Sequence, residues 1–274
     1  MIESKSNVII QGADNRPILI DITNPKQINK KKFIILSHGF KGFKDWGPFN
    51  HIAKEFAFQG FTLVKFNFSH NGTTIEDPTN FGNLEAFGNN NFCKELDDLG
   101  FVLDWVEKNL NPNEISLFGH SRGGGISMLK TAEDNRIKKV ISWASPSDFS
   151  NRMPEERIAS WKEKGVAFVF NGRTKQNMPM YYQFYENCIE NKQRIDIKSA
   201  IEQLTIPQLI VHGSDDPTVQ LAEAKNLKRW NNSAQLSIIK GADHVFGGRH
   251  PFDLDKFPPH LNEAIDITIN FLKK

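Results

Sequence analysis

Residues 115–123 read Ile-Ser-Leu-Phe-Gly-His-Ser-Arg-Gly, and this stretch decides the fold that we predict for the chain. The apolar run 115–118 has the character of a buried strand, and a helical pattern begins directly after Ser121. A serine between a strand and a helix, with glycine two positions away on each side, is typical of a sharp turn that exposes the hydroxyl group. We therefore predict that Ser121 is a nucleophile; the alternative is a plain glycine-rich turn.

Short apolar runs alternate with helical patterns along most of the chain. Helices are predicted at residues 92–110, 45–58 and 121–132. Strands are predicted at residues 33–36, 61–66, 115–118, 140–143, 208–211 and 236–239, after a leading antiparallel pair at 7–10 and 17–22. This alternation predicts an α/β fold with a mostly parallel eight-stranded sheet and helices on both faces.

The polar, aromatic-rich segment 147–203 interrupts the alternation. Structureless loops of this length are uncommon, so we predict a small inserted cap between two core parts, residues 1–146 and 204–274. Tyr181 and Tyr182, together with Arg173 and Tyr185, are candidates to bind substrate under this cap. The alternative is that the cap aromatics form a small core of their own.

Composition excludes several other classes. The 34 Lys and Arg residues nearly balance the 32 Asp and Glu residues, and the net charge of +2 does not indicate a nucleic-acid partner. No stretch approaches the roughly 20 apolar residues of a membrane span and the N-terminus lacks a signal core, so we expect a cytoplasmic protein. Cys93 and Cys188 lack metal-site or disulfide spacing, and no glycine-rich phosphate loop indicates a nucleotide cofactor.

A serine nucleophile needs a general base, and the sequence offers His244 directly after the last predicted strand. The other candidates fit less well. His212 ends a strand and is interpreted as a packed residue, whereas His250 and His260 lie in polar sequence beside proline. We therefore predict that His244 takes the proton from Ser121.

The acid that orients the histidine is expected in the loop after residues 208–211. Asp215 and Asp216 are adjacent there, and only one of them can meet the imidazole. We favour Asp216 because Pro217 follows it and Val219 can anchor the next helix. Asp215 is the next candidate, and Asp148 is the third, with a turn or N-cap role as its alternative.

Acyl transfer also needs donors for the developing oxyanion. The backbone N–H groups of Arg122 and Phe40 are predicted to supply them, because Phe40 lies in the loop that follows residues 33–36. His38, Gly39 and His120 are further candidates to line the substrate site, and His38 is interpreted as fixing the loop rather than acting as a base. A metal site from His244, His250 and Asp253 is set aside, because the intervening glycines and proline fit no compact ligand helix.

Four segments together resemble the α/β-hydrolase superfamily: residues 38–40, 119–123, 212–216 and 241–244. The cap, the 67–72 loop and residues 87–90 more narrowly resemble cap-bearing microbial esterases of the cinnamoyl and feruloyl esterase kind. Those enzymes usually carry glutamine where this chain has Arg122. The resemblance implies an α/β-hydrolase fold with a Ser121, Asp216 and His244 triad and no cofactor or metal.

The residues and the resemblance together predict a serine hydrolase that cleaves a carboxylic ester of a small molecule through an acyl-enzyme. Thioester, amide or C–C bond hydrolysis on the same triad is the nearest alternative, since the fold does not choose the leaving group. A ligand-binding protein without turnover is the alternative from another class. The expected partner is a small-molecule ester, and a homodimer is left open.

Overall fold

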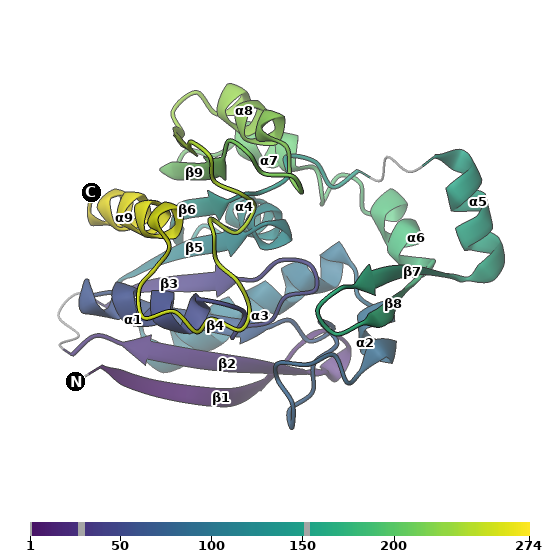
Figure 1. Ribbon diagram of the computed structural model, residues 1–274, viewed down its shortest axis with the longest axis horizontal. Coiled ribbons are helices and arrows are strands. Elements are labelled where there is room, and N and C mark those ends of the chain that lie inside the picture. Colours follow the sequence, from purple (N-terminus) through teal and green to yellow (C-terminus); the bar gives the residue numbers. More distant parts are fainter. Residues whose placement is uncertain (1, 27–30, 151–153) are drawn as a thin grey trace.

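The computed structural model describes residues 2–26, 31–150 and 154–274. Its centre is an eight-stranded sheet (Figure 1). The strand order is β1 (Glu3–Gln11), β2 (Pro17–Asn24), β4 (Thr62–Asn67), β3 (Lys32–Ser37), β5 (Glu114–His120), β6 (Ile137–Trp143), β9 (Gln208–Gly213) and β10 (Gln235–Ile239). Each strand predicted from the sequence overlaps one of these, and the predicted fold class is confirmed.

The sheet combines an antiparallel edge with a parallel body. β1 pairs with β2, and β2 with β4, in antiparallel fashion, and the short helical turn η1 (Ala13–Asn15) joins the first two strands. The remaining neighbours, from β4 through β3, β5, β6 and β9 to β10, pair in parallel. Parallel strands end at one edge of a sheet, so the loops after β3, β5, β9 and β10 meet there.

Helices cover both faces of the sheet and bury two apolar layers. α1 (Phe49–Phe58) and α9 (Pro259–Lys273) lie on one face, while α3 (Phe92–Leu110), α4 (Arg122–Glu133) and α8 (Leu221–Trp230) lie on the other. Side chains alternate along β3 accordingly: Ile34 and Leu36 pack with α1 and α9, whereas Phe33 and Ile35 pack on the opposite side.

α3 has the bounds that the apolar spacing predicts. Its first turn is capped by Asn91, whose side chain accepts a hydrogen bond from the Lys94 N–H at 3.0 Å. The helix ends at Leu110, and the C-cap residue Asn111 adopts a left-handed conformation immediately before Pro112. The first turn of α3 carries Phe92 and Glu95, which contact Phe184 and Arg122.

α1 begins later than the predicted residue 45. Gly47 has a φ of +51° and Pro48 occupies the N-cap position, so the helix starts at Phe49. A left-handed residue followed by proline cannot continue a right-handed helix toward the N-terminus. Residues 45–48 instead extend the loop after β3, which carries the predicted oxyanion donor Phe40.

The segment between β6 and β9 forms elements that lie outside the large sheet. β7 (Val166–Asn171) and β8 (Gln176–Tyr181) pair as a separate antiparallel hairpin, and α5 (Glu155–Lys164) and α6 (Gln183–Glu190) flank it (Figure 1). The short α2 (Leu84–Gly88) packs against β8, and α7 (Ile197–Glu202) packs against α4 of the core. Within residues 2–26, 31–150 and 154–274, no helix has the length and apolar character of a membrane span.

Candidate active site

Ser121 lies at the turn between β5 and α4, in a strained conformation with φ 54° and ψ −126°. Its N–H donates to the Trp143 carbonyl at 2.8 Å, which holds the turn against the neighbouring strand. A Cβ on Gly119 would lie 2.1 Å from the Gly123 carbonyl oxygen, and one on Gly123 would lie 2.2 Å from that of Ser37. Both flanking positions therefore require glycine, which is the steric demand of a nucleophile turn.

His244 and Asp216 come together from the loops after β10 and β9. The Nδ1 of His244 donates to Oδ2 of Asp216 at 2.8 Å, and the Asp216 side chain is fully buried. The other oxygen of Asp216, Oδ1, accepts from the backbone N–H groups of Thr218 (2.8 Å) and Val219 (2.9 Å). The carboxylate is thus fixed in orientation, and it keeps the His244 proton on Nδ1 and leaves Nε2 as a base.

The rival acids and bases have other partners. Asp215 accepts a hydrogen bond from the Ser214 hydroxyl, and the Asp148 carboxylate accepts from Ser150. His212 donates from Nε2 to the Val219 carbonyl at 2.8 Å, behind the Asp216 carboxylate. His250 accepts the N–H of Gly47 at 2.9 Å.

No described residues form a group of three side chains suited to hold a metal. The three residues considered above as metal ligands have other contacts. Asp253 forms an ion pair with Arg249, His250 accepts the Gly47 N–H, and His244 donates to Asp216. These three side chains are therefore engaged with separate partners.

A cavity of about 220 Å³ brings the predicted site residues together. Ser121 and His244 line it, and so do His38, Gly39, Phe40 and His120. The position of a Cβ on Gly39 is 3.0 Å from Ser121 Cβ, so the loop after β3 passes directly beside Ser121.

His38 and His120 hold the loops of this cavity in place. Burial lowers the pKa of His38 to about 4, and the neutral ring accepts the Phe68 N–H on Nε2 and donates from Nδ1 to the Gly39 carbonyl. Burial lowers the pKa of His120 to about 3, and its Nε2 donates to the His244 carbonyl at 2.9 Å. As neutral groups, the two histidines thus fix the loop after β3 and the loop after β10 by hydrogen bonds.

The Arg122 side chain packs away from solvent among aromatic rings. Its guanidinium lies 4.1 Å from the centre of the Phe40 ring and 5.0 Å from that of Phe92. It also lies 3.3 Å from the buried carboxylate of Glu95, whose pKa is raised by burial and lowered in part by Arg122. Stacked and paired in this way, Arg122 borders a second cleft of about 900 Å³, which is lined by apolar side chains such as Trp161 and by charged ones such as Arg157 and Lys164.

The β7–β8 hairpin lines the Ser121 cavity through its turn, and the predicted cap tyrosines do not line it. Asn171 and Arg173 line the cavity, whereas Tyr181 donates a hydrogen bond to Glu85 and Tyr182 packs against Trp161. Neither Tyr181 nor Tyr182 is among the residues that line either cleft. The sequence signal for this turn was Asn-Gly-Arg at residues 171–173, between two apolar runs.

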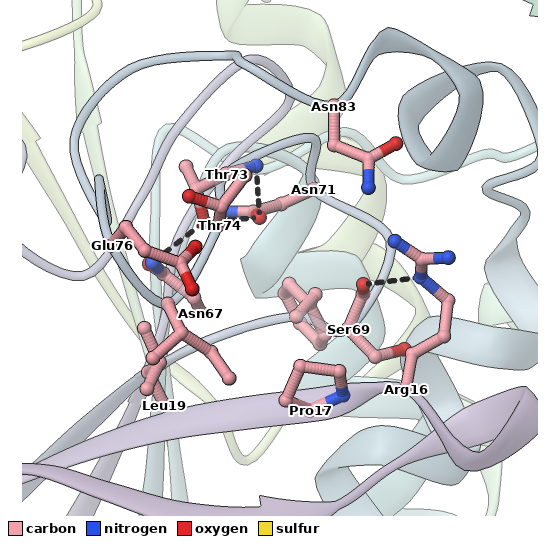
Figure 2. A pocket seen from close by; sticks show the side chains of 12 residues that line it. Arg16, Pro17, Leu19, Asn67, Ser69, Asn71, Thr73, Thr74, Glu76 and Asn83 are labelled. Atoms are coloured by element: carbon pink, nitrogen blue, oxygen red, sulfur yellow. Dashed lines mark hydrogen bonds between the residues drawn. The ribbon is translucent and has the colours of Figure 1, made fainter.

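A separate cavity of about 220 Å³ lies between the start of β2 and the loop after β4, and none of the proposed triad residues lines it (Figure 2). Its amide side chains are bound to neighbouring groups: Asn67 donates to Thr73, and Asn71 accepts from Thr73. Asn67 also accepts the Lys44 N–H at 2.6 Å, and Asn71 donates to the Gly42 carbonyl. The walls of this cavity therefore brace the loop that carries Phe40.

The strand order, the serine turn after β5 and the acid and histidine loops after β9 and β10 define the class: the chain has the α/β-hydrolase fold. No protein-family model matches it. The chain is similar to Est1E from Butyrivibrio proteoclasticus with bound ferulic acid, at a TM-score of 0.75, 19% identity and coverage of 97% of this chain and 98% of that one. The likeness of fold to α/β-hydrolases and cap-bearing esterases that the sequence predicted is confirmed.

Two further relatives agree with this class. The α/β hydrolase GrgF from Penicillium sp. sh18 has a TM-score of 0.75 and 18% identity, over 99% of this chain and 98% of that one. The lysophosphatidylserine lipase ABHD12 of Danio rerio is 21% identical over 227 residues, which cover 80% of this chain and 53% of the relative. The chain spans about half the length of the curated relatives it matches first.

Proposed function

We propose that the protein is a serine hydrolase that cleaves a carboxylic ester of a small molecule through an acyl-enzyme intermediate. The observation that carries the proposal is the His244–Asp216 hydrogen bond of 2.8 Å at the rim of a cavity that also holds Ser121 in a strained turn. These are the three chemical roles that a serine nucleophile needs: an exposed hydroxyl, a base and a group that orients the base.

In the proposed reaction, His244 Nε2 takes the proton of Ser121 Oγ as the oxygen attacks the ester carbonyl carbon. The backbone N–H groups of Phe40 and Arg122 bind the resulting oxyanion, and Asp216 stabilises the imidazolium. The imidazolium then donates its proton to the leaving alcohol as the C–O bond breaks. A water molecule, deprotonated by His244, attacks the acyl-enzyme and releases the acid with Ser121 regenerated.

In this proposal the core carries the reacting groups and the cap covers the substrate cavity. The proposed core, residues 1–146 and 204–274, supplies the triad and both oxyanion donors, and the proposed cap, residues 147–203, places Asn171 and Arg173 over the cavity. Two similar proteins support an ester as the substrate class: Est1E, which binds ferulic acid, and ABHD12, a lysophosphatidylserine lipase.

The experiment that tests the proposal compares the intact chain with Ser121→Ala on p-nitrophenyl butyrate. The wild-type chain is expected to release p-nitrophenol with saturation kinetics, and the variant is expected to lose this activity while keeping its thermal unfolding temperature. Ser127, which is buried in α4 away from the cavity lining, offers a matched control as Ser127→Ala. Equal activity of Ser121→Ala and wild type would refute the assignment.

A further inference from the structure

The cavity that holds Ser121 has an unbalanced charge. Lys41 and Arg173 line it, and none of its lining residues is an Asp or a Glu. The three histidines on its wall do not add negative charge, and the pKa values of His38 and His120 are lowered by burial, so these rings are neutral. In a chain whose total charge is only +2, this cavity concentrates positive charge beside the nucleophile.

The two cations come from distant parts of the sequence: Lys41 from the loop after β3 and Arg173 from the turn between β7 and β8. Lys41 follows Phe40 in the loop after β3 and donates one ammonium N–H to the Phe170 carbonyl of β7 at 3.2 Å. Arg173 lies in the turn between β7 and β8 and donates to the Thr79 carbonyl and to the Asn80 side chain. An ammonium has three N–H groups and a guanidinium five, so both side chains keep unused donors.

Neither cation forms an ion pair with a carboxylate of the described residues, although the charge of Asp77 acts on Arg173 and partly offsets the effect of burial on its pKa. Within the part of the chain that the structure describes, no Asp or Glu oxygen comes within the 4.0 Å of an ion pair with Lys41 or Arg173. Burial lowers the pKa of the Lys41 ammonium and of the Arg173 guanidinium, because partial removal from water disfavours their charged forms. An anion bound between them would offset this cost, since it would replace the missing hydration with opposite charge.

We propose that the substrate of this site carries a second, negatively charged group, a carboxylate or a phosphate, and that Lys41 and Arg173 bind that group while Ser121 attacks the ester. The inference rests on the proposed esterase function and names its substrate class. Because Ser121 and the two cations line the same cavity, the ester and the anionic group would belong to one molecule.

The test uses pairs of esters that differ in charge but match in size. One pair is para-acetoxybenzoate and para-acetoxybenzamide, with the charge on the leaving alcohol; the other is mono-p-nitrophenyl adipate and its terminal amide, with the charge on the acyl chain. The readout is the ratio of kcat/KM for the anionic ester to that for the neutral ester, for each pair. The pair with the larger ratio shows on which side of the ester Lys41 and Arg173 lie.

The wild-type ratio is expected to exceed about tenfold in one pair at low salt, and to fall as salt screens the cations. Lys41→Gln and Arg173→Gln are each expected to lower that ratio about fivefold, the equivalent of roughly 1 kcal/mol for one charge pair. Lys41→Arg should restore it, because the charge returns at the same place. Lys225→Gln, at an exposed lysine of α8 that does not line the cavity, is the matched control and should leave the ratio unchanged.

Two results would overturn the inference: a wild-type ratio near one in both pairs, or a ratio that stays unchanged in Lys41→Gln and Arg173→Gln. An unchanged ratio with an equal loss of activity on both esters would mean that the cations support the loop or the oxyanion. If wild type hydrolyses no ester, the proposed function fails, and calorimetric binding of para-hydroxybenzoate and para-hydroxybenzamide decides the inference separately. Preferential binding of the benzoate, lost in Lys41→Gln, would support the anion site; equal or absent binding of both would overturn it.

Discussion

Asp216→Asn is the substitution for which the structure gives the sharpest expectation. Oδ1 of Asp216 accepts two backbone N–H groups, from Thr218 and Val219, and Oδ2 accepts from His244 Nδ1. An asparagine must keep its carbonyl oxygen toward the two backbone donors, because the reverse orientation would lose both hydrogen bonds, about 1 kcal/mol each. Its NH₂ group then faces His244 Nδ1 and forces the imidazole proton onto Nε2, where the ring cannot accept a proton from Ser121.

The magnitude follows from two contributions. To bring the imidazole proton back to Nδ1, the asparagine amide must turn around, and this costs the two backbone hydrogen bonds, about 2 kcal/mol in total. The lost attraction between carboxylate and imidazolium adds about 4 kcal/mol for unit charges 4 Å apart at an effective dielectric constant of 20. The sum of about 6 kcal/mol corresponds to roughly a 10⁴-fold decrease in kcat, the size that the equivalent substitution produces in a known Ser-His-Asp enzyme.

The assay is hydrolysis of p-nitrophenyl butyrate at pH 8, with thermal unfolding as a check on folding. Asp215→Asn is the matched control, because Asp215 is the sequence neighbour and its carboxylate binds Ser214 instead of His244. It should keep its activity within about threefold, since its charge lies outside the proposed triad. An Asp216→Asn variant that folds and keeps more than a tenth of the wild-type kcat would refute this account of Asp216.

Four further expectations concern stability. Gly123→Ala should abolish activity and destabilise the fold by about 3 kcal/mol in urea unfolding, because the new Cβ would lie 2.2 Å from the Ser37 carbonyl; unchanged unfolding would contradict the packing of the turn. Gly100→Ala, inside α3 with its nearest neighbour a flexible lysine end at 3.5 Å, should instead stabilise by about 0.5–1 kcal/mol. Trp143→Phe should cost about 2 kcal/mol for its buried indole hydrogen bond, and no loss would argue against that bond. Burial lowers the pKa of His38 to about 4, so the stabilisation from its neutral ring is full above pH 6.5 and about 3 kcal/mol of it is lost by pH 4. The free energy of unfolding of His38→Gln should therefore change less between about pH 6.5 and pH 4 than that of the wild-type chain.

The core of the fold could be predicted from the sequence because its signals are local. The strands of the parallel body are short apolar runs, and α3 has one apolar face between a capping Asn91 and a terminating Asn111. The start of α1 was wrong by four residues, because apolar spacing alone did not register that Gly47 takes a left-handed conformation before Pro48. Local backbone conformation overrode the helical pattern there.

The sequence could predict those site residues that lie in loops directly after strands. Ser121, Asp216 and His244 were named from their positions after β5, β9 and β10, and the structure brings these loops to one edge of the sheet. Asn171 was not named, because it reaches the cavity through the fold of the cap hairpin, which depends on contacts between distant segments. Tyr181 was named as a candidate, and its hydroxyl instead binds Glu85 of α2.

A largely buried group of four charged side chains was not predicted from the sequence. Lys44 and Lys65 are each about 2% exposed and both bind Asp21 and Asp45, with Lys44 and Lys65 lying 2.8 Å and 2.6 Å from Asp21 Oδ2. Lysine in a strand ordinarily indicates a solvent-facing position, and only the pairing of β2 with β4 places Asp21 beside Lys65. This group anchors the loop after β3, and with it the proposed oxyanion donor, to the antiparallel edge of the sheet.

The central claim, that Ser121 is an activated nucleophile, is tested most directly by reaction with a fluorophosphonate probe followed by mass spectrometry of the intact chain and of its peptides. The account predicts one adduct per chain, located on the peptide that contains Ser121, absent in Ser121→Ala and strongly slowed in Asp216→Asn. A folded wild-type chain that takes up no probe, or takes it up on another residue with Ser121 unmodified, would contradict the claim.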